Sequence, residues 1–198
     1  MTDEEWNDWN VSSIKTLSVC EASGMAVGGE ASKVCKKGAV KMTSNFVNIE
    51  NAIKNYLDED GWHYEMKEDE EVAVFHFTLT VSGKIRELQY FVEVHEDGFS
   101  SIAVFPVNAD IEDKQMMAEF LHRANYSLRE GNFEFDFRDG EIHYKCFIDC
   151  DGGIIPTKSM VRNSVLLPYH MYMRFVDGIL GIIFNQETGK DAIEKCKS

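Results

Sequence analysis

The stretch Asn132-Phe-Glu-Phe-Asp-Phe-Arg-Asp-Gly-Glu-Ile142 alternates apolar and charged side chains. A period of two is typical of a strand with one face in a core, and here it points three phenylalanines inward: Phe133, Phe135 and Phe137. The Asp139-Gly140 pair that follows predicts a two-residue hairpin. A return strand over residues 141–150 would align a second inward row: Ile142, Tyr144, Cys146, Ile148 and Cys150. The stretch therefore predicts antiparallel pairing.

The same period of two appears upstream, where β-branched and aromatic residues are frequent. Short turns at Ser82-Gly83-Lys84 and Glu96-Asp97-Gly98 divide this region and set the register between its strands. The strands of this meander are expected at residues 71–81, 85–95 and 99–107, with an edge strand before them at 62–67.

Helical spacing of apolar residues surrounds these strands. One helix is expected from the capping run Thr43-Ser44-Asn45 to Asp60, and a second from Asp110 to Arg129. The inward stripe of the second helix is expected to contain Ile111, Met117, Phe120, Leu121, Ala124 and Leu128. The order of elements has no βαβ crossover, so it predicts an α+β fold in which helices cover one face of an antiparallel sheet.

The C-terminal region predicts a helix over residues 157–167, a break at Leu167-Pro168, a helix over 171–184, and a last short helix to Cys196. Residues 171–184 have few polar side chains, chiefly Arg174 and Asp177. Such a helix is buried on nearly every side, either against a partner or inside the chain's own core, and helical periodicity does not choose between them. For the first alternative, five residues form the expected protein interface: Met171, Phe175, Ile179, Ile182 and Ile183.

Composition and charge limit the classes of function. Lys and Arg total 20 against 34 Asp and Glu, a formal charge of −14. This charge repels nucleic acids and acidic lipid surfaces, so neither is an expected partner. The acidic start of the chain does not look like a secretory signal, and the 5 cysteines have irregular spacing. Both features favour a cytoplasmic protein with reduced thiols.

Residues 1–42 differ from the rest of the chain and are expected to form an atypical or flexible arm, leaving residues 43–198 as one α+β domain. The arm holds 5 basic and 6 acidic side chains, so nearly all the net charge follows it. Trp6 and Trp9 could meet a partner from one side of a short helix. The glycines of residues 24–33 do not match the order of a phosphate-binding loop, and no cofactor is expected.

Candidate catalytic and metal-ligating residues are few. His76, His95 and His143 lie on or next to expected strands, where a carboxylate could make one of them a general base. Cys146 and Cys150 are four residues apart, a separation of about 13 Å on a strand, which is too far to share a metal ion. The main alternative to a binding role is therefore a small enzyme or small-molecule-binding protein with a polar pocket on the open sheet face.

The order of elements, the hairpin at residues 132–142 and the helix broken at Leu167-Pro168 resemble the YbjN-like bacterial proteins, whose fold is similar to that of type III secretion chaperones. The resemblance covers residues 43–195. It implies a cytoplasmic, non-enzymatic module that often forms homodimers and binds or regulates other proteins. It supplies no catalytic residues.

Overall fold

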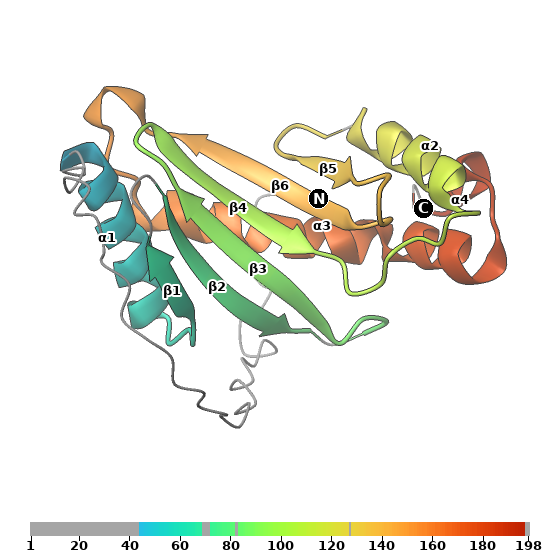
Figure 1. Cartoon of the computed structure of the whole chain (residues 1–198), viewed down its shortest axis with the longest axis horizontal. Helices are drawn as coiled ribbons and strands as arrows, with labels where there is room; N and C mark the ends of the chain where they lie inside the picture. The colour runs from blue at the N-terminus through green and yellow to red at the C-terminus, as the bar shows by residue number, and fades with distance from the viewer. Residues whose placement is uncertain (1–43, 69–71, 82, 127, 197–198) are drawn as a thin grey trace, which may run out of the picture.

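A six-stranded antiparallel sheet organises the protein, and its strands follow the order β1-β2-β3-β4-β6-β5 (Figure 1). The computed structural model describes residues 44–68, 72–81, 83–126 and 128–196. The strands are β1 (Glu65–Glu68), β2 (Ala73–Thr80), β3 (Glu87–Val94), β4 (Gly98–Val104), β5 (Asn132–Phe135) and β6 (Ile142–Asp149). The predicted meander is confirmed as β2, β3 and β4, and the predicted edge strand as β1.

Helices pack against one face of this sheet. They are α1 (Ser44–Glu59), α2 (Lys114–Asn125), α3 (Lys158–Asn185) and α4 (Gly189–Lys195). Figure 1 shows α3 running behind the strands, α1 near one end of the sheet, and α2 with α4 near the other. Thr157 caps α3 by accepting a hydrogen bond from the Met160 N–H at 3.2 Å. The α+β fold predicted from the sequence is thus present.

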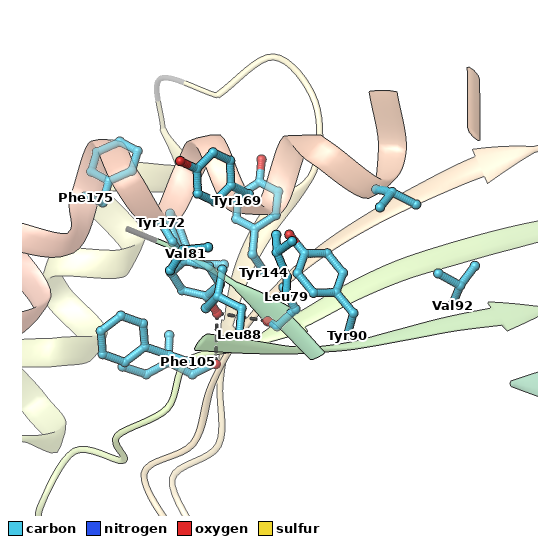
Figure 2. Packing of buried hydrophobic residues seen from close by; sticks show 14 of the residues in the cluster. Leu79, Val81, Leu88, Tyr90, Val92, Phe105, Tyr144, Tyr169, Tyr172 and Phe175 are labelled. Carbon is cyan, nitrogen blue, oxygen red and sulfur yellow. Dashed lines mark hydrogen bonds between the residues drawn. The ribbon is translucent and has the colours of Figure 1, made fainter. Parts of the chain in front are cut away.

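Two polar contacts fix α3 on the sheet. The Tyr172 hydroxyl lies 2.9 Å from the Ala103 carbonyl and 3.0 Å from the Ile142 carbonyl, on adjacent strands. Closer to the start of α3, the Ser101 hydroxyl donates to the Ser164 hydroxyl at 3.2 Å. Figure 2 shows Tyr172 among the large side chains that fill the space between helix and sheet. Because buried polar groups are costly without partners, these bonds favour one position of the helix.

The hairpin differs from its prediction. Phe135, not Phe137, lies opposite Ile142, and the Gly140 N–H donates to the Asp136 carbonyl to close a longer loop. Gly140 has a φ of 82°, and a Cβ there would lie 2.0 Å from the Ala109 carbonyl oxygen. The longer loop carries Phe137 out of the sheet, where 53% of its surface is exposed. The predicted two-residue turn and inward Phe137 were therefore wrong.

The second predicted helix is shorter than expected. Helix α2 begins at Lys114, and Ile111, assigned to its buried stripe, is 82% exposed. The preceding chain instead binds the hairpin loop, because the Ala109 N–H donates to the Gly140 carbonyl at 2.9 Å. The Lys114 ammonium also donates to the Phe137 carbonyl at 2.8 Å. These tertiary bonds outweigh the local helical pattern.

Helix α3 is continuous through Pro168, so the predicted break is wrong. Proline removes the N–H that would bond to the carbonyl four residues earlier, at Ser164. Burial of both neighbouring turns, through Val165 and Tyr169, offsets this loss. Among the described residues, no helix is long and apolar enough to cross a membrane. The predictions for Trp6, Trp9 and the glycines of residues 24–33 lie outside the described residues.

Candidate protein-binding face

The five residues predicted as an interface on α3 face in different directions. Phe175, Ile179 and Ile182 are buried in the core of this one chain, while Met171 and Ile183 are half-buried. The exposed side of the helix carries Arg174 and Asp177 instead. The structure therefore places most of this helix in the chain's own core, the second alternative that the sequence left open.

The sheet face opposite α3, here called the open face, carries an apolar group at its centre. Phe91 on β3 lies directly opposite Ile102 on β4, and Phe147 on β6 lies diagonally next to Ile102. We call these three residues the open-face patch. No described helix lies over the strands on this side (Figure 1). An antiparallel sheet with a solvated face is expected to be polar there, so a central apolar patch is unusual.

Phe147 is the most accessible member of the patch, with 49% of its surface exposed. Its ring lies over the start of β4, because a Cβ added at Gly98 would come within 2.7 Å of the ring. On the same face Ser100 is only 3% exposed and Ile102 9%. The patch is therefore closely packed around a protruding phenylalanine.

The edge of β6 beside Phe147 has no strand partner among the described residues. Strand β5 pairs with β6 only as far as Asn132 opposite Lys145, which leaves residues 146–149 unpaired on that side. We call this segment the β6 edge. The Ile142 carbonyl and the Cys150 N–H both form hydrogen bonds on the side of the strand that faces β4. Along a strand, the backbone N–H and C=O groups of successive residues point alternately to one side and to the other. The backbone N–H and C=O of Phe147 consequently point outward.

Carboxylates gather where β6 ends. The β3–β4 turn and the end of β6 lie side by side, because Gly98 is opposite Asp149 and the Cys150 N–H donates to the Asp97 carbonyl at 2.7 Å. Burial, with a contribution from Asp149 and Asp97, raises the pKa of the Cys150 thiol. We call this group the acidic end, and it consists of Glu93, Glu96, Asp97, Asp149 and Asp151.

Besides His143 Nε2, which lies close to Glu141, two polar atoms on the open face are buried without a hydrogen-bond partner among the described residues: His76 Nε2 and Thr80 Oγ1. The His76 ring stacks on Phe91, with centroids 4.7 Å apart and planes 19° from parallel. Buried polar atoms are normally paired, so these atoms are available to a bound group.

The three candidate histidines do not meet. His76 on β2 and His143 on β6 are separated by β3 and β4, which corresponds to about 14 Å at the spacing of neighbouring strands. His95 lies at the β3–β4 turn, away from both. Only His143 approaches a carboxylate, with Nε2 2.9 Å from Glu141 Oε2. Among these three histidines the structure therefore shows one contact with a carboxylate and no convergent histidine site in the described part of the chain.

Cys146 on β6 and Cys150, directly after this strand, point away from the open face. Cys146 and Cys150 are buried on the core side, whereas His143 faces the other way. Burial raises the pKa of the Cys146 thiol to about 11, which makes it a weak nucleophile at neutral pH. Within the described ranges, no group of three or more His, Cys, Asp or Glu side chains is arranged to hold a metal ion.

Sequence reasoning did not identify the open-face patch. Its members sit at alternate positions facing away from the core, where the strand pattern predicts polar side chains. A signal was nevertheless present, since Phe91, Ile102 and Phe147 break the polar half of that alternation on three strands. Combining them required the strand order, which places β6 beside β4.

The fold and the open face together define an α+β protein with an open antiparallel sheet. Helices cover one side of this sheet, and the open-face patch lies on the other. No family model, curated protein or solved structure matches the chain.

Proposed function

We propose that this protein is a non-enzymatic, chaperone-like binding or regulatory module that receives an extended segment of a partner protein at the β6 edge. The observation that carries the proposal is Phe147, an exposed aromatic side chain on a strand whose outer edge has no described partner. Extended peptides add to such edges through main-chain hydrogen bonds, and neighbouring side chains supply specificity. The resemblance to YbjN-like proteins, and through them to secretion chaperones, supports the same class of function.

The surroundings of the edge define the chemistry of the partner. Phe147 and the rest of the open-face patch favour apolar side chains, while the acidic end favours lysine or arginine. The segment is therefore extended, basic and partly apolar.

Fluorescence polarisation with two labelled 13-residue peptides tests this function. One peptide alternates valine with lysine, and the other alternates valine with glutamate. The proposal predicts saturable binding of the Val-Lys peptide at least tenfold tighter than that of the Val-Glu peptide, equivalent to about 1.4 kcal/mol. Equal affinities, or no saturable binding of either peptide, would contradict it.

The homodimer expected from the sequence is part of the proposal. Light scattering on the 22.6 kDa chain at micromolar concentration tests it directly, with twice that mass expected. The alternative of a small enzyme or ligand-binding protein has less support, because its three histidines lie apart.

A further inference from the structure

We infer that residues 31–43 of the same chain occupy the β6 edge when no partner is bound. This inference rests on the proposed function, since it names an internal competitor for the same place. Three observations support it: the position where this segment joins the fold, its length, and its charge.

The junction lies next to the β6 edge. Asn45, in the first turn of α1, donates hydrogen bonds through Nδ2 to the Glu96 carbonyl at 2.7 Å and the Cys150 carbonyl at 3.1 Å. Cys150 directly follows the last residue of the edge. Ser44, the first described residue, therefore lies near the end of the strand that lacks a neighbour, and residues 31–43 directly precede it in the sequence.

The segment is long enough to cover the edge. At about 3.3 Å per residue, its 13 residues span about 43 Å when extended, whereas the four residues of the edge span about 13 Å. Val40 and Met42 are two residues apart and share one side of an extended chain, which suits them to the open-face patch. The Asn45 Oδ1 atom, buried and without a hydrogen-bond partner among the described residues, lies at the same junction.

The charges are complementary. Residues 31–43 contain four lysines and no acid, although the whole chain has a formal charge of −14. The acidic end presents five carboxylates around the junction and around Phe147. Lysines at positions 33, 36, 37 and 41 can pair with these carboxylates, which makes this segment an internal example of the basic, apolar partner.

Carbodiimide crosslinking of the full chain tests the inference, because the reagent joins only amines and carboxylates that are already in contact. The inference predicts crosslinks from Lys33, Lys36, Lys37 or Lys41 to the acidic end at yields at least fivefold above those to Glu112, an exposed acid near α2 at the other end of the molecule. In a mixture of ¹⁴N- and ¹⁵N-labelled protein, these crosslinks should join two residues that carry the same isotope, because both belong to one chain. Equal yields at Glu112, no crosslinks to the acidic end, or mixed-isotope crosslinks would overturn it.

Two exposed phenylalanines provide matched variants. Phe147→Asp should lower the crosslink yield at least fivefold, whereas Phe184→Asp, at the end of α3, should leave it unchanged. Equal yields in both would overturn the role of the open-face patch as the docking surface.

A second variant separates this inference from the proposed function. Replacing the four lysines with glutamate should increase affinity for the Val-Lys peptide at least tenfold, because the competitor is repelled. Crosslinks in the original chain without peptide binding to this variant would leave the internal segment in place and reject the proposed function. Peptide binding of equal strength to the original chain and to the variant with four glutamates, without crosslinks in the original chain, would keep the proposed function and reject the internal segment.

Discussion

Asn45 donates a 2.7 Å hydrogen bond to the carbonyl oxygen of Glu96, a residue 51 positions later in the chain. The same amide group reaches Cys150 at the end of β6. One side chain thus ties the first turn of α1 to two turns at the end of the sheet. It fixes the start of α1 beside the end of β6.

Replacing Asn45 with alanine should therefore lower the free energy of unfolding by about 1–2 kcal/mol, since two carbonyls, one exposed and one partly buried, lose their donor. Urea denaturation followed by circular dichroism measures this change. Asn51→Ala, on the exposed side of α1, is the control and should change stability by less than about 0.5 kcal/mol. Equal effects of the two variants would show that the Asn45 bonds do not hold the helix.

Phe175 tests whether α3 belongs to the core. Phe175→Ala should lower the free energy of unfolding by about 3–5 kcal/mol, because the ring is buried against Phe120 and Phe133. Phe184→Ala, near the end of the same helix and 68% exposed, should cost less than about 0.5 kcal/mol. A Phe175→Ala variant that keeps full stability but loses a dimer in light scattering would restore the predicted α3 interface.

Tyr172→Phe isolates one hydroxyl group. It keeps the ring and removes the polar contact with the Ala103 and Ile142 carbonyls, so we expect a loss of about 1–2 kcal/mol in the free energy of unfolding. Tyr126→Phe removes an exposed hydroxyl and serves as the control. If thermal and chemical denaturation show no difference between these variants, the hydroxyl does not contribute to the position of α3.

The hairpin loop should respond to acid. Hydrogen bonds from the Arg138 side chain and backbone N–H lower the pKa of Asp136 from 3.8 to about 2. A depressed folded pKa means that the ionised carboxylate stabilises the loop above about pH 4, and that this contribution is lost as the pH falls toward 2. An NMR titration of the Asp136 carboxyl carbon should show the low midpoint, and Arg138→Ala should raise it. An unchanged midpoint in that variant would contradict the assignment.

The sequence was informative where local pattern and tertiary packing agree. The alternation in residues 73–104 predicted the meander because each inward side chain, such as Phe75 or Tyr90, is buried as the pattern requires. It was less informative where distant residues decide the outcome. Gly140 and Ala109 bond to each other across 31 positions, and this contact both lengthens the hairpin loop and delays the start of α2.

The open face shows the same limit of sequence-based prediction. The apolar helix at residues 171–184 was noticeable in the sequence, but most of its apolar side chains pack in the chain's own core. The open-face patch has one member on each of three strands, and the last of these, Phe147, follows Ile102 by 45 positions. Only the pairing of β4 with β6 brings them together.

The central claim is that Phe147 marks the place where an extended segment binds, and the most direct test is peptide affinity in two matched variants. Fluorescence polarisation with the Val-Lys peptide should show at least tenfold weaker binding to Phe147→Asp than to the original protein, and unchanged binding to Phe184→Asp. Circular dichroism should show that both variants remain folded, because 49% of the surface of Phe147 and 68% of that of Phe184 is exposed. Unchanged affinity for the Phe147→Asp variant would contradict the account.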